Sequence, residues 1–146
     1  MRTRILLQVW YVWLIASLIG VLSPASLFAQ AAISPAASIA GQLGPPGDTI
    51  LSVVDFTTVT DPDGLLGAPG QYIAKARFTD STGISGDVEV FANARDARTR
   101  LGSLAGAAAA GQEVDTGEGL VILRLYFLSG DANAYRTALT LALTSS

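Results

Sequence analysis

The sequence predicts an α+β fold, a two-layer sandwich in which two helices cover one face of a mainly antiparallel sheet. The first observation is the strict alternation of apolar and polar residues over 72–80 and 87–93, which is typical of half-buried strands. The second is the three- and four-residue spacing of apolar residues over 94–110 and 131–143, which is typical of amphipathic helices. With one strand before this pair and one between the helices, the expected order is β-β-β-α-β-α.

Residues 1–31 are predicted to be a secretory signal peptide. Residues 1–4 (MRTR) are positively charged, residues 5–22 are almost entirely apolar, and a run of small residues ends in Ala29-Gln30-Ala31. This order is the pattern of a cleavable signal, with the cut expected after Ala31 or, as the alternative, after Ala29. The other interpretation is an uncleaved anchor, because the apolar run is near the lower limit for spanning a bilayer. Both place the domain outside the cytoplasm, secreted or at the cell surface or periplasm.

Residues 32–48 are rich in Ala, Ser, Gly and Pro and show no periodicity, so we expect a flexible spacer there and a single domain over 49–146. The first strand is expected over 50–56. The sequence Asp61-Pro62-Asp63-Gly64 then predicts a turn, because Pro presets φ and Gly accepts a positive φ.

The remaining elements follow from patterning and caps. The strands over 72–80 and 87–93 are joined by a short turn, so they should pair antiparallel. Asn93 is a candidate N-cap for the first helix and Ser129 for the last. Residues 113–127 are apolar on nearly both sides and predict one strand in the centre of the sheet.

Composition excludes several chemistries. The chain has no cysteine and no histidine, which removes thiol catalysis, Ser-His-Asp sites, disulfides and the usual zinc ligands. Without the signal peptide it carries seven basic residues against twelve acidic ones, a net charge of −5. A domain of that sign repels phosphates, so we expect no nucleic-acid partner.

Residues 61–72 (DPDGLLGAPGQY) resemble a motif of small, mostly uncharacterised bacterial secreted proteins and lipoproteins, with the pattern D-P-N-x-L-L-G-R-P-x-Q-Y. The resemblance extends in order over residues 61–143. The chain departs from the pattern at Asp63 and Ala68, and it lacks the lipobox cysteine that many of these proteins carry. The resemblance implies an extracytoplasmic location and a common fold, and it implies no activity.

The candidate binding surface is the sheet face opposite the helices, which we expect to be open. Arg and aromatic residues are enriched in binding patches, and on the predicted register this face gathers the candidates Arg77, Phe91, Arg124 and Tyr126. The alternative is cross-strand ion pairing of Lys75 or Arg77 with Asp87 or Glu89. On the first helix, Arg95, Arg98 and Arg100 predict a solvated face, with an Asp96–Arg100 pair.

Asp61 and Asp63 are candidate calcium ligands, because carboxylates at alternate positions can converge on Ca²⁺. The later positions of a calcium loop hold Leu65 and Tyr72, so the alternative is a turn whose carboxylates accept backbone N–H bonds. Asp87 and Glu89 offer the less favoured alternative of a carboxylate hydrolase.

The sequence therefore predicts an exported, non-enzymatic domain that binds a protein or envelope component through its open sheet face. The alternative is a module that binds calcium or a small ligand. No other cofactor is expected, and a membrane would be met only through an uncleaved N-terminal segment.

Overall fold

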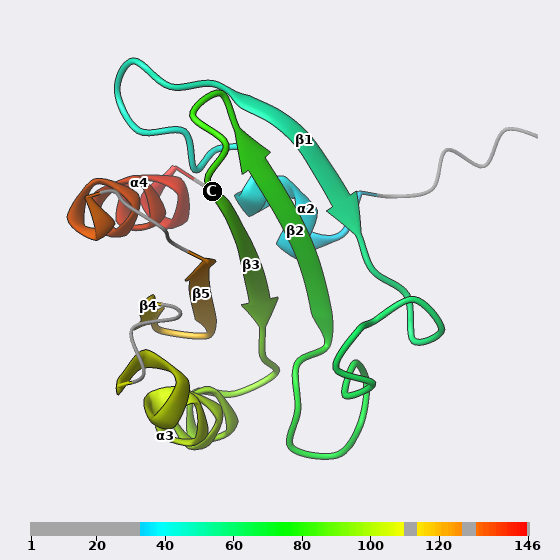
Figure 1. Ribbon diagram of the computed structural model, residues 1–146. Helices are drawn as coiled ribbons and strands as arrows, with labels where there is room; N and C mark the ends of the chain where they lie inside the picture. Colours follow the sequence, from blue (N-terminus) through cyan, green and yellow to red (C-terminus); the bar gives the residue numbers. More distant parts are fainter. Residues whose placement is uncertain (1–32, 110–113, 127–130, 146) are drawn as a thin grey trace, which may run out of the picture. The chain divides into compact units, whose positions relative to one another are not determined.

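The computed structural model describes residues 33–109, 114–126 and 131–145 of the chain. The chain divides into two units, residues 1–32 and 33–146, and every described residue belongs to the second. The predicted signal peptide lies outside the described residues. Figure 1 shows the elements, which are α2 (Pro35–Ala40), β1 (Ile50–Asp55), β2 (Ala74–Asp80), β3 (Ser85–Val90), α3 (Ala94–Ala109), β4 (Val114–Glu118), β5 (Val121–Tyr126) and α4 (Ala132–Thr144).

The five strands form one antiparallel sheet in the order β1-β2-β3-β5-β4, which confirms the α+β class. The hairpin of β2 and β3 forms as expected, with Arg77 opposite Asp87. The turn between the two strands is fastened by the carboxylate of Asp80, which accepts the backbone N–H groups of Thr82 and Ile84. An Asp side chain that bonds its own turn in this way favours a tight connection between antiparallel strands.

The single strand predicted over 113–127 is a hairpin of two strands, β4 and β5. Glu118 pairs with Val121, which leaves a two-residue loop, and Gly119 in that loop has a φ of 58°. Two-residue hairpins need positive φ at their first loop position, and glycine takes it without a steric cost. The prediction was wrong because residues 120–126 are apolar on nearly both faces, and this continuous run hides the turn at Gly119-Leu120.

The segment predicted as a flexible spacer begins with helix α2, so that prediction is also wrong at this point. Ser34 caps the helix by accepting the backbone N–H of Ala37, and Pro35 occupies the first helical turn. Ser before Pro is a strong start signal because Pro needs no hydrogen-bond partner there. Ala36, Ala40 and Leu43 are completely buried against the sheet.

The helices cover both faces of the sheet, which corrects the prediction that both lie on one face. Neighbouring residues of a strand point to opposite faces. Leu123 of β5 packs in one apolar cluster with Tyr135 of α4 and with residues of α2, whereas Ile122 packs with Ala97 of α3. The helical period predicts an apolar stripe on each helix but does not say which face of the sheet it covers.

Both long helices begin at side-chain caps. Asn93 accepts the backbone N–H of Asp96, as expected for α3. Helix α4 is capped by Asp131, which accepts the N–H of Asn133; the predicted cap Ser129 lies outside the described residues. The residues of α4 that were predicted to face the core are all buried: Tyr135, Ala138, Leu139 and Ala142.

Candidate functional site

The loop over residues 57–72 folds back onto the sheet around the carboxylate of Asp61. One oxygen of Asp61 accepts the backbone N–H groups of Leu65 and Leu66 at 2.8 and 2.9 Å and the hydroxyl of Tyr72 at 2.7 Å. The other oxygen lies 3.2 Å from Nζ of Lys75. A carboxylate with this many donors organises the whole turn, as the alternative interpretation of the Asp-Pro-Asp-Gly motif expected.

Lys75 on β2 is the centre of the site. Its side chain is completely buried, and its ammonium lies 2.7 Å from Asp63, 3.2 Å from Asp61, 3.4 Å from Asp87 and 4.0 Å from Glu89. A buried cation is stable only when carboxylates replace its lost hydration. Four carboxylates from the motif loop and from β3 do so here.

Two arginines close the site from other elements. Arg100 of α3 binds both carboxylate oxygens of Glu89, at 3.0 and 3.1 Å, and also Asp63, at 3.1 Å. Arg124 of β5 binds Asp63 at 3.1 Å and Glu89 at 3.2 Å. The site therefore ties the motif loop, three strands and α3 together. We call it the ion cluster, and its members are Asp61, Asp63, Lys75, Arg77, Asp87, Glu89, Arg100 and Arg124.

The ion cluster contains four carboxylates and four cations, so its charges balance. This environment lowers the pKa of two of its aspartates, Asp61 and Asp63. Burial by itself would raise the pKa of Asp61, but hydrogen bonds from Tyr72, Leu66 and Leu65 and the charge of Lys75 outweigh it, and the pKa ends well below its ordinary value. Burial would also raise the pKa of Asp63, but Lys75 and the two arginines outweigh it and lower this pKa below its ordinary value. Both carboxylates are therefore ionised at neutral pH.

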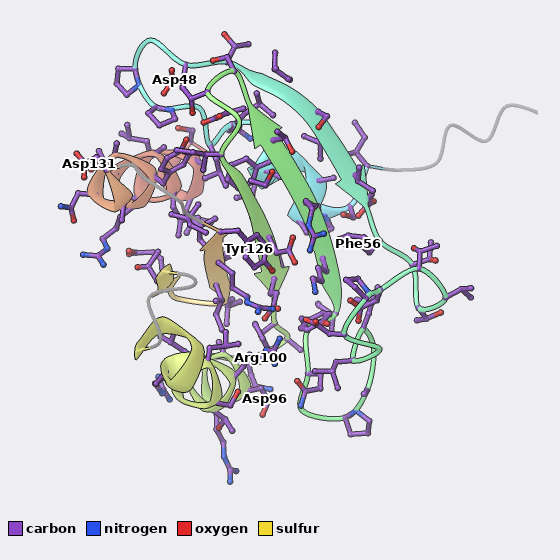
Figure 2. The ribbon with its side chains drawn as sticks, in the orientation of Figure 1. Asp48, Phe56, Asp96, Arg100, Tyr126 and Asp131 are labelled. Atoms are coloured by element: carbon purple, nitrogen blue, oxygen red, sulfur yellow. The ribbon has the colours of Figure 1, made fainter. Side chains whose placement is uncertain are left out.

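The sheet face that carries the ion cluster is open around Arg77. Arg77 binds Asp87 through two parallel hydrogen bonds of 2.6 and 2.9 Å, and its side chain is 39% exposed. Its guanidinium carbon lies 5.6 Å from the ring centre of Phe56 and 5.4 Å from that of Tyr126. The hydroxyl of Tyr126 also donates to Asp87, at 2.9 Å. We call Phe56, Arg77 and Tyr126 the arginine–aromatic patch; Figure 2 labels Phe56 and Tyr126 and, on α3, Arg100.

The predicted binding residues divide into two groups. Arg77 and Tyr126 are partly exposed on the patch. Phe91 is buried, with its ring edge-on to Tyr72 at 6.1 Å, and Arg124 is buried in the ion cluster, so neither lies on an open surface. The prediction failed for Phe91 and Arg124 because α3 and the motif loop cover the part of the sheet face on which these two residues lie.

Sequence reasoning missed two contributors to the site. Arg100 was expected on a solvated helix face, paired with Asp96, whereas it turns inward to Glu89 and Asp96 bonds Asn93 instead. Phe56 was assigned to a strand without a role in binding. The two cations of β2 are balanced by the carboxylates opposite them, Lys75 by Glu89 and Arg77 by Asp87. The two further carboxylates of the motif loop, Asp61 and Asp63, were the available signal that other elements supply cations.

The geometry does not favour calcium at Asp61 and Asp63. Lys75 already bridges the two carboxylates, and a cation would have to displace its ammonium. Within the described ranges no group of three or more acidic residues is arranged to hold a metal ion. Asp87 and Glu89, the candidates for a hydrolase, are completely buried and ion-paired.

Two cavities lie away from the ion cluster. One of about 230 Å³ lies between α3 and the hairpin of β4 and β5, and it is lined mainly by small and apolar residues such as Ala97, Leu101 and Ile122. The other, of about 310 Å³, is bordered by Asp48, Ile84 and Tyr135 beside the start of α4. The lining of the first cavity includes one charged residue, Arg98, and that of the second includes a further carboxylate, Asp131.

Comparisons with protein-family models, with curated proteins and with solved structures gave no match. No helix in the described part of the chain is both long and apolar enough to cross a membrane. Function is therefore inferred from the residues of the site alone.

Proposed function

We propose that this chain is an exported, non-enzymatic binding domain that recognises a protein partner through the arginine–aromatic patch. The observation that carries the proposal is the position of Arg77 between the rings of Phe56 and Tyr126, with its carboxylate partner Asp87 buried beneath it. Arginine and aromatic residues are the side chains that contribute most to protein interfaces.

The patch is held in place before a partner arrives. Two N–H groups of Arg77 bind Asp87, so the guanidinium plane is fixed and little conformational entropy is lost on binding. A guanidinium has five N–H donors, and those directed to solvent suit a carboxylate or a backbone carbonyl of the partner. The rings on both sides provide apolar area for a partner side chain.

The surface around the patch suits a protein contact. Val54 of β1 lies opposite Arg77 and is 52% exposed. Thr79 and Ser85 lie one step further along the strands, and their hydroxyls bond each other at 2.9 Å. A mixture of one apolar side chain, small hydroxyls and an arginine with aromatic neighbours is typical of a protein interface with a polar rim.

Export is supported by two independent observations. The Ala-x-Ala sequence ends at Ala31, and the unit that carries the sheet begins at Ile33, next to that boundary. Cleavage there would release a domain that starts almost at its first helix.

The buried state of Asp87 and Glu89 supports the non-enzymatic part of the proposal, because a catalytic carboxylate must reach its substrate.

The experiment is affinity capture from the envelope and secreted fractions of the source cells, with the exported protein as bait. We expect a protein that wild type retains and that Arg77→Ala and Phe56→Ala lose. The matched control is Arg95→Ala, which removes an equally charged but exposed arginine from α3, and it should retain the partner. Circular dichroism verifies that each variant is folded. Equal capture by the patch variants and the control would refute the proposal.

A further inference from the structure

Strand β1 forms one border of the sheet, and part of its backbone faces outward. The backbone N–H of Phe56 donates to the carbonyl of Lys75. Along an antiparallel strand pair such as β1 and β2, hydrogen-bonded positions alternate with positions that face away from the partner strand. Val54 therefore bonds β2 as well, whereas the N–H and C=O groups of Val53 and Asp55 point away from it. Figure 1 shows β1 as the outermost described strand on its side of the sheet.

The side chains of this edge are apolar and exposed. Leu51 is 68%, Val54 52% and Val53 37% exposed, and Asp55 is the only charged residue of the strand. Natural edge strands are usually blocked by Lys, Pro or a bulge. The single irregularity of β1 lies between Ile50 and Ser52, so the stretch from Val53 to Asp55 is regular and holds no Lys or Pro; its Asp55 accepts the hydroxyl of Ser34 at 2.6 Å.

We propose that two copies of this chain associate through antiparallel pairing of their β1 strands. A two-fold axis at Val53 lets the outward groups of each Val53 bond the other copy, and it places Leu51 and Val53 of each copy against the strand of the other. The same surface then serves on both copies, as a two-fold interface requires. The inference goes beyond the proposed function and does not depend on it.

The one charge on β1 is compatible with a second copy at this edge. With the axis at Val53, each Asp55 faces Leu51 of the other copy, and the two carboxylates are about 13 Å apart, from four residues at ~3.3 Å each.

The first test is sedimentation velocity over a series of concentrations, with the protein purified after expression of the full chain. Wild type should dimerise reversibly. Val53→Pro removes the outward N–H and should raise the dissociation constant at least about tenfold, equivalent to 1.4 kcal/mol, while the bonds of β1 to β2 remain. Val53→Lys should do the same by placing two ammonium groups at the axis. Val59→Lys is the matched control, because Val59 is 90% exposed on a loop, and it should dimerise like wild type.

The second test uses the absence of cysteine from the chain. Val53→Cys places two thiols at the axis, where the backbones of a hydrogen-bonded pair are about 5.5 Å apart, within disulfide range. Mild oxidation should convert this variant to a covalent dimer much faster than Val59→Cys. A monomeric wild type at every concentration, or equal crosslinking of the two cysteine variants, would overturn the inference. Because partner capture is measured separately, failure here leaves the proposed function standing.

Discussion

Replacement of Lys75 by methionine is the most direct test of the ion cluster. Methionine keeps most of the length and packing of the side chain and removes the ammonium group, which leaves four carboxylates around three arginines. An exposed ion pair contributes at most about 1 kcal/mol. Removal of one member of a buried pair costs about 3–5 kcal/mol, because the remaining charge stays buried without compensation. Lys75 is completely buried, so the larger figure applies, a large part of the 5–15 kcal/mol typical of a whole domain.

The assay is urea unfolding followed by far-ultraviolet circular dichroism, because both tryptophans lie in the N-terminal segment. Arg95→Met is the control for loss of an exposed charge, and its free energy of unfolding should stay within about 0.5 kcal/mol of wild type. The double variant Lys75→Met with Asp63→Asn restores the charge balance and should regain about 1 kcal/mol or more. A loss below 1 kcal/mol for Lys75→Met alone would refute the argument.

The pH dependence gives the same test a second readout. In wild type the pKa values of Asp61 and Asp63 are lowered below 3.8, so the stability they contribute is present above that pH and is lost as the pH falls toward their folded-state values. In Lys75→Met the carboxylates lose their central cation, and one should bind a proton more readily than in the unfolded chain. Its contribution then falls as the pH rises. The stability difference between the two proteins should therefore shrink below about pH 4.

Two further predictions concern the fold and the motif loop. Gly86→Ala should destabilise the domain by about 1–3 kcal/mol, measured by urea unfolding, because a Cβ there would lie 2.7 Å from the carbonyl of Arg124 and 2.8 Å from the ring of Phe78; an unchanged midpoint would contradict this close approach. Millimolar calcium should leave the melting temperature unchanged, since Lys75 occupies the space between Asp61 and Asp63. A calcium-dependent rise would restore the metal hypothesis.

Several patterns that depend on neighbours in sequence were predicted well, although helix α2 and the hairpin of β4 and β5 were missed. Tyr135, Ala138, Leu139 and Ala142 are the buried residues of α4, as their spacing indicated, and Asn93 caps α3. These features require only the period of a helix and the chemistry of its first turn. The hairpin of β2 and β3 follows from alternation and a turn in the same way.

Features that depend on distant segments were not predicted. Arg100 is eleven residues from Glu89 and thirty-seven from Asp63, and nothing in the helical pattern of α3 indicates that this arginine turns inward. The burial of Phe91 follows from the motif loop, whose Tyr72 packs against it. Alternation identified which residues share a face of the sheet, but the identity of the covering segment decides which of them are exposed.

The Asp-Pro-Asp-Gly motif is explained by contacts within the domain. Asp61 bonds its own loop, Asp63 accepts Lys75 and two arginines, and Tyr72 donates back to Asp61. Every polar side chain over 61–63 and at 72 thus has an internal partner, so the motif is what fastens the loop to the sheet. The contacts that we propose with partners lie outside it, at Arg77, Phe56 and the edge of β1, where the side chains reach solvent.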